Sequence, residues 1–205
     1  METGRVEAFS DGVIAIAITL LVLEIHVPEA APGELGRALL DQWPSYAAYA
    51  VSFAVIGIMW VNHHRIFHLV ATVDRPLLFM NLLLLMFIAL FPFPTALLAE
   101  HLRSGGNDAQ LAAAVYSTNA TGCALAFNLM WRWIVRDERL IHSHLSIQAL
   151  QRGTRRFTLG LIVYPIAIGM SFVSAPLTLG LHAMTAVYYV VDQLVVREDQ
   201  SQSSD

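Results

Sequence analysis

The sequence contains no lysine, and all twelve of its basic residues are arginine. Charged residues of both signs make up 14% of its 205 residues, against about 25% in a typical soluble domain. Hydrophobic residues reach 56%, and the mean hydropathy is +0.57. A soluble chain this apolar could not cover its surface with polar groups. The composition therefore predicts a membrane protein and excludes an ordinary soluble domain.

The sequence also has little that would support covalent or redox chemistry. Its single cysteine, Cys123, excludes an internal disulfide and a metal site built from cysteines. No G-x-S-x-G or H-E-x-x-H motif is present, and no pair of acidic residues lies at a catalytic spacing in the apolar segments. The first apolar segment runs into Glu24, His26 and Pro28 with no small-residue cleavage site, so we do not expect a signal peptide. These absences predict a membrane protein that is not an enzyme.

Long hydrophobic runs dominate what is present. A helix needs about 20 mostly apolar residues to cross the hydrocarbon of a bilayer. Six segments reach this length: residues 6–25, 46–67, 77–98, 109–134, 157–173 and 177–196. We therefore predict an all-α membrane protein with one six-helix domain over residues 1–198 and a disordered polar tail over 199–205. Pro92 and Pro94 should kink the third helix, and the fifth and sixth should form a tight antiparallel hairpin.

Arginine placement predicts the topology. With the N-terminus in the cytoplasm, ten arginines fall inside and two, Arg37 and Arg103, fall outside. Both termini should therefore be cytoplasmic. The longest inner connection, residues 136–156, contains LIHSHLSIQAL, whose pattern indicates a short amphipathic helix on the membrane surface.

The first segment has two distinct faces on a helical wheel. One face carries an apolar stripe at positions i, i+4 and i+7, formed by Ile16, Leu20 and Leu23, with Phe9, Gly12 and Thr19 beside it. From the wheel alone, packing against another helix explains such a stripe more often than a pore lining does. Thr19 alone is a weak signal, because threonine often bonds to a backbone carbonyl one turn back.

The other face carries Ser10 and Asp11. A carboxylate inside an apolar segment faces the protein interior or water and usually has a partner. Topology offers Arg5, His63, His64 and Arg65 at the same depth, and we predict a network of these groups with Trp60 and Asn62. Asp11 could serve permeation or hold helices together. His63, His64 and His68 could sense pH near neutrality or anchor the interface. We expect no metal site there, because no carboxylate lies at a zinc-type spacing.

The string R-x-x-x-F-S-D, formed by Arg5, Phe9, Ser10 and Asp11 and followed by GVIAIAITLLVLEI, resembles the first helix of the bacterial transmembrane protein 175 family. These proteins are relatives of the lysosomal potassium channel. The WVNHHRIF end of the second segment, the length and the long inner loop are similar too. The resemblance implies a homotetramer in a bacterial inner membrane, with the first helix of each subunit lining a central pore. The expected partners are other copies of the chain and the lipid bilayer, with no nucleic acid.

The resemblance further implies passive conduction of potassium in preference to sodium, without a cofactor and without a TVGYG filter, which this sequence also lacks. It assigns the constriction to Ile16, Leu20 and Leu23 and ion selection to Thr19. A narrow apolar ring can gate a pore by dewetting.

The sequence leaves other functions open, which are a small secondary transporter, a proton-coupled carrier and a non-conducting scaffold. His182 and Asp192 on the last segment form a possible second polar contact, for which the sequence offers no partner.

Overall fold

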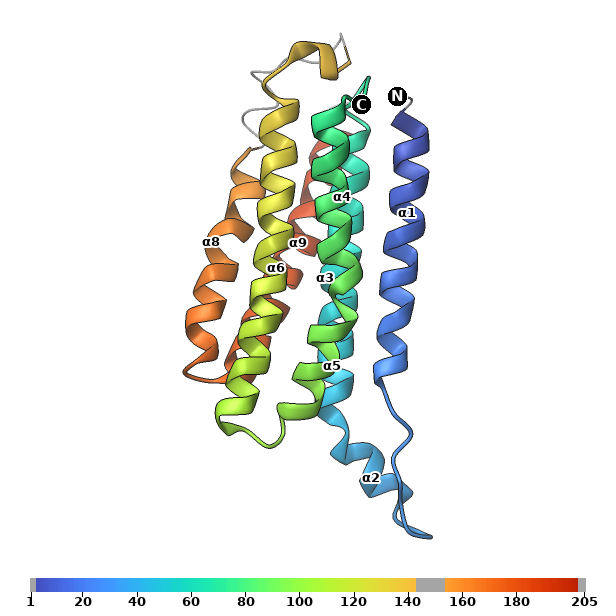
Figure 1. Ribbon diagram of the computed structural model, residues 1–205, viewed down its shortest axis with the longest axis vertical. Coiled ribbons are helices and arrows are strands. Elements are labelled where there is room, and N and C mark those ends of the chain that lie inside the picture. The colour runs from blue at the N-terminus through green and yellow to red at the C-terminus, as the bar shows by residue number, and fades with distance from the viewer. Residues whose placement is uncertain (1–2, 143–153, 203–205) are drawn as a thin grey trace.

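The computed structural model describes the backbone of residues 3–142 and 154–202, and the side chains of 3–142 and 158–191. Within these ranges the chain is helical, and one isolated bridge pairs Val70 with Ile141. Figure 1 shows long helices running side by side along the longest axis of the molecule. The helices, in chain order, are α1 (Thr3–Leu20), the 3₁₀ turn η1 (Leu21–Glu24), α2 (Leu35–Asp41), α3 (Trp43–Phe67), α4 (Arg75–Leu90), α5 (Pro92–His101), α6 (Gly106–Ile134), the 3₁₀ turn η2 (Glu138–Leu140), α8 (Thr154–Ser171) and α9 (Ala175–Gln202).

All six predicted segments lie in helices. By length and composition, three helical stretches of the described chain could cross a membrane: Thr3–Glu24, Trp43–Phe67 and Arg75–His101. The apolar parts of α8 and α9, Thr158–Ser171 and Ala175–Val191, are shorter. Helix α6 has 29 residues, but it carries Ser117, Thr118, Asn119, Thr121 and Asn128, which lower its hydropathy. Membrane crossing by α6, α8 and α9 therefore stays a prediction.

The third predicted segment is broken at its prolines. Helix α4 ends at Leu90 and α5 begins at Pro92, with Phe91 between them. Pro92 lies at the start of α5, where a missing backbone N–H removes no helical hydrogen bond. The structure therefore replaces the expected kink with two consecutive helices.

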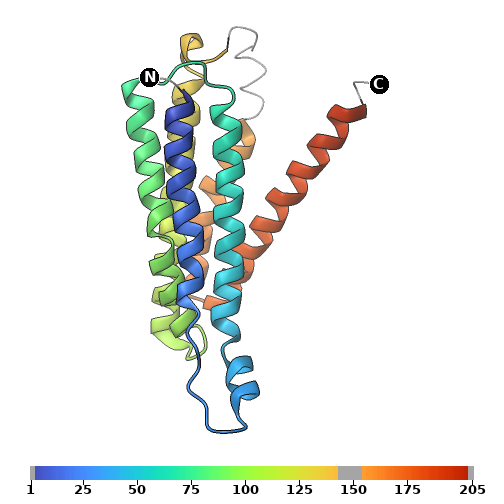
Figure 2. The same ribbon diagram turned by 90° about the vertical axis from the view of Figure 1, so that its right-hand side faces the viewer.

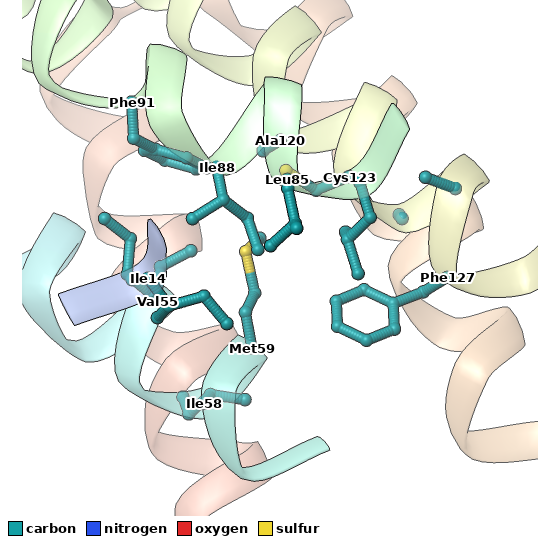
Figure 3. Close-up of a cluster of buried hydrophobic side chains, with 14 of the residues drawn as sticks. Ile14, Val55, Ile58, Met59, Leu85, Ile88, Phe91, Ala120, Cys123 and Phe127 are labelled. Carbon is teal, nitrogen blue, oxygen red and sulfur yellow. The ribbon is translucent and has the colours of Figure 1, made fainter. Parts of the chain in front are cut away.

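Helix α1 stands at one edge of the bundle and packs on α3 and α4 (Figures 1 and 2). Its inner face consists of Val6, Ser10, Ile14 and Ala17, which are all buried, and Leu21 of η1 continues this face. Figure 3 shows Ile14 beside Val55 of α3, with Ile88 of α4 nearby in the same buried cluster. These residues recur every three or four positions, so one stripe of α1 seals against its own subunit.

Helices α8 and α9 are joined by only three residues, 172–174, as the sequence predicted. They contact each other near this connection, but α9 then runs away from the bundle toward its C-terminal end (Figure 2). The predicted domain boundary at residue 198 falls within α9, which continues to Gln202. The predicted surface helix over LIHSHLSIQAL lies almost entirely outside the described residues.

Candidate functional site

The outer face of α1 is apolar and uncovered. Ile16 is 61% exposed, Leu20 40% and Leu23 67%, and Phe9 and Thr19 are exposed on the same side. The 3₁₀ turn η1 tightens the end of the helix and carries Leu23 and Glu24. Packing inside the subunit therefore does not explain the stripe that the sequence predicted, because the subunit packs on the opposite face of α1.

Thr19 directs its hydroxyl hydrogen back to its own helix. Its Oγ1 lies 2.9 Å from the carbonyl oxygens of both Ala15 and Ile16. A hydroxyl has one hydrogen to donate and two lone pairs to accept with. With the hydrogen used by the backbone, the lone pairs of this exposed oxygen are available to a cation or to water.

A buried polar network joins α1, α3 and α4 near the N-terminal end of α1. Asn81 Nδ2 donates to Ser10 Oγ at 2.9 Å, and Ser10 Oγ donates to the Val6 carbonyl at 2.8 Å. His63 Nε2 lies 2.9 Å from Asn81 Oδ1, so this nitrogen carries the hydrogen. Ser10, His63 and Asn81 are each fully buried. The amide of Asn81 therefore bridges the two groups that the sequence placed at one depth.

Asp11 has a different partner from those the sequence offered. Trp60 Nε1 donates to Asp11 Oδ1 at 2.9 Å. Trp60 was a predicted member of the network, but not as the partner of the carboxylate. The bond ties α1 to α3 on the solvent side of the buried network.

His64 turns to Glu7 instead of Asp11. Its Nδ1 lies 2.7 Å from Glu7 Oε1, and its Nε2 lies 3.0 Å from His68 Nε2. The ring of His64 also stacks on Trp60, with centroids 6.1 Å apart and planes at 18°. Glu7 thus contacts one of two histidines that lie one helical turn apart, although it precedes His64 by 57 residues in the sequence.

The structure does not bring two of the motif residues into this network. Arg5 is exposed and makes no hydrogen bond or ion pair with the described part of the chain. Phe9 is 55% exposed and lies on the side of the apolar stripe. Asn81 was not among the residues predicted for this network. A polar residue at the depth of Ser10 and His63 was the signal that could have identified it.

A second buried polar cluster lies deeper in the bundle. Ser52 Oγ lies 2.8 Å from Thr95 Oγ1 and 3.0 Å from the hydroxyl of Tyr116. His182, whose partner the sequence did not supply, lies with its Nε2 2.9 Å from Ser117 Oγ. The side chain of Asp192 lies outside the described residues.

Comparison with known proteins places these features in a known family. Residues 5–92 match the family described as "Endosomal/lysosomal potassium channel TMEM175". A protein of Streptomyces collinus named as a potassium channel is 55% identical over 196 residues, which cover 95% of each chain. The crystal structure of a homologue from Chamaesiphon minutus, described as a lysosomal potassium-selective channel TMEM175 homologue, matches with a TM-score of 0.82. It is 44% identical, over 93% of this chain and 97% of that one.

An animal relative matches over a shorter region. The human endosomal/lysosomal proton channel TMEM175 is 41% identical over 97 residues, which are 43% of this chain and 19% of the human protein. The potassium channel MtTMEM175 (T38A variant), at 23% identity and a TM-score of 0.62, shares the fold.

Proposed function

Because this chain belongs to the TMEM175 family of potassium channels, we propose that it conducts potassium passively through a pore lined by α1. The relatives named as potassium channels match over nearly the whole chain, and a solved channel shares its fold. A membrane channel needs no catalytic residues or organic cofactor, and potassium is its permeant ion.

The observation that carries the proposal is the uncovered apolar stripe on α1. Large apolar side chains exposed over several turns mark a surface that meets lipid, another subunit or a pore. Lipid alone would not require the polar contacts that hold α1 in one orientation through Ser10 and Asp11. One α1 helix cannot enclose a pore, so we propose a homotetramer in which four copies of α1 surround the axis.

In this arrangement Ile16, Leu20 and Leu23 form stacked apolar rings. Such rings hold a narrow neck closed by expelling water, and an ion that enters the neck loses hydration. A slight widening then admits a partly dehydrated ion. Potassium gives up water more readily than sodium, so an apolar neck favours potassium modestly without a carbonyl filter. The Thr19 oxygen, whose hydrogen is held by the backbone, replaces part of the lost water.

We place the protein in a bacterial inner membrane with six crossings and both termini in the cytoplasm. The arginine distribution supports this orientation. Figure 2 supports it too, because α1 begins and α9 ends toward the same end of the molecule. Glu24 then lies near the outer mouth, where a carboxylate raises the local concentration of cations.

The test is potassium flux from proteoliposomes, compared with sodium flux under an equal gradient. We expect potassium to pass faster in the parent protein. Ile16→Asn should raise the leak or reduce the preference, because a polar ring wets the neck. Ile162→Asn is the matched control, since Ile162 is 56% exposed on α8, at the edge of the subunit away from α1 (Figure 1). Folded parent protein without flux, or equal effects of both variants, would contradict the proposal.

The alternatives make different demands on the sequence. A secondary transporter needs ionisable groups near the midplane, often beside broken helices. The middle of α1, from Val13 to Leu20, contains none. A scaffold would lose stability in Ile16→Asn without gaining a leak.

Because the human relative is named as a proton channel, the flux assay should include a proton gradient at equal potassium.

A further inference from the structure

The cluster of Glu7, His64 and His68 takes no part in the proposed conduction path. Each side chain offers one ligand atom, and the three atoms lie within 4.8 Å of one another. No metal site was predicted from the sequence, because no carboxylate lies at a suitable spacing from the histidines. In the fold, however, the Glu7 carboxylate of α1 lies beside His64 near the end of α3.

Both the ligand types and their spacing suit a first-row transition metal. Imidazole nitrogens bind zinc, copper and nickel, and a carboxylate completes common three-ligand zinc sets. His64 lies in the last turn of α3, and His68, four positions later, is its C-cap residue with helical backbone angles, so both rings lie on one face. Tetrahedral bonds of about 2.0–2.1 Å bring ligand atoms to roughly 3.3 Å from one another. The 3.0 Å between the two Nε2 atoms is close to this separation.

The two histidines meet through their Nε2 atoms, which is the arrangement that an ion bound between them requires. A single hydrogen between two Nε2 atoms satisfies one donor and one acceptor. A metal in its place accepts a lone pair from each ring, and Glu7 becomes the third ligand by rotating its carboxylate away from His64 Nδ1, from which its Oε1 lies 2.7 Å. Neighbouring groups hold the site in shape, because Trp60 stacks on His64 and is itself fixed by Asp11. Such outer contacts orient metal ligands in proteins.

We propose that Glu7, His64 and His68 form a binding site for a divalent transition metal of the zinc class. The site joins the N-terminal end of α1 to the C-terminal end of α3 within one subunit. Both histidines are exposed and Glu7 is half-buried, so the metal enters from solvent and keeps water in its remaining position.

Calorimetric titration of the tag-free, full-length protein with zinc tests the site, with magnesium as a hard cation for comparison. We expect about one zinc ion per chain and no magnesium binding, since magnesium prefers oxygen ligands. His68→Gln and Glu7→Gln should each weaken zinc binding by at least about tenfold, because each removes a ligand. The control His26→Gln, at the far end of α1, should bind like the parent. No zinc binding by the parent, or equal binding by His68→Gln, would overturn the site.

One consequence rests on the proposed function. If α1 lines the pore, zinc restrains its N-terminal end and lowers potassium flux when added on that side. His68→Gln should then conduct without zinc sensitivity. A conducting parent that binds zinc with unchanged flux would overturn this consequence. A parent that does not conduct contradicts the proposed function instead, and the titration still decides the site.

Discussion

At the scale of single residues, the key feature of the subunit is the amide of Asn81. It uses both ends at once, donating to Ser10 of α1 and accepting from His63 of α3. Three helices therefore depend on one side chain. His63 Nδ1 has no partner among the described residues. With the hydrogen on Nε2, Nδ1 is a buried acceptor that receives no hydrogen bond. With the hydrogen on Nδ1, the ring would instead bury an N–H donor without an acceptor.

This arrangement predicts a large loss of stability for Asn81→Leu. The substitution keeps the volume similar but leaves the His63 N–H and the Ser10 oxygen without their partner. An unsatisfied buried polar group costs about 1–3 kcal/mol. Thermal unfolding in detergent should show a lower midpoint for this variant. The exposed variant His26→Leu, measured beside it, should unfold like the parent. A midpoint for Asn81→Leu equal to that of the parent would mean that the amide does not hold the three helices together.

At the scale of helices, the sequence predicted which segments form helices better than it predicted how those helices are arranged. Apolar runs near 20 residues and the prolines at 92 and 94 are local signals, so the helices and the place where the third segment is interrupted could be predicted, although the expected kink is a break between α4 and α5. The apolar stripe of α1 also followed from its periodicity, but its exposure did not, because the wheel alone favoured packing against another helix. Which helices touch depends on packing between distant segments. The sequence therefore could not supply the Glu7–His64 contact or the divergence of α9 from α8 (Figure 2).

The α4–α6 contact shows how tightly helices approach in this bundle. A Cβ added at Gly122 of α6 would lie 2.5–2.7 Å from the ring of Phe87 on α4. Small residues allow such close approach between helices in membranes. A side chain at Gly122 would therefore displace the Phe87 ring, in contrast to Gly57 of α3, where a Cβ would meet nothing within 4 Å.

Gly122→Ala should therefore destabilise the protein even though alanine favours a helix over glycine by about 1 kcal/mol. The added methyl forces the Phe87 ring out of its place, and overpacking typically costs about 1–3 kcal/mol. Gly57→Ala is the matched control, and its unfolding midpoint should be unchanged or raised. Phe87→Leu should partly rescue Gly122→Ala, which a double-mutant cycle of unfolding midpoints would reveal. Additive effects of the two substitutions would contradict the contact.

At the scale of the whole molecule, one face of the subunit is left uncovered. Its buried residues account for the inner face of α1, and its outer face is left to something else. The family resemblance supplied the tetramer and the pore in the sequence analysis, because no pattern within one chain encodes the number of copies. The exposed stripe is the surface that we propose a second copy meets.

The proposed assembly predicts cross-links between copies at the stripe. The native cysteine, Cys123, is buried in α6. The substitution Cys123→Ala removes it and gives a cysteine-free background. In that background, Ile16→Cys should give covalent dimers on mild oxidation, since neighbouring copies at a constriction approach closely. A disulfide needs Cα atoms within about 7 Å of each other. Ile162→Cys, on α8, should stay monomeric on a denaturing gel, because we place this position far from the axis.

Native mass spectrometry of the same samples decides the copy number. We expect a species of four 22.6 kDa chains for the parent and for both cysteine variants. The tetramer and the cross-link are separate results. Four copies without a cross-link at Ile16 would place α1 away from the axis and move the pore to another helix. A cross-link in a two-copy species would keep α1 at an interface but leave too few helices to surround a pore.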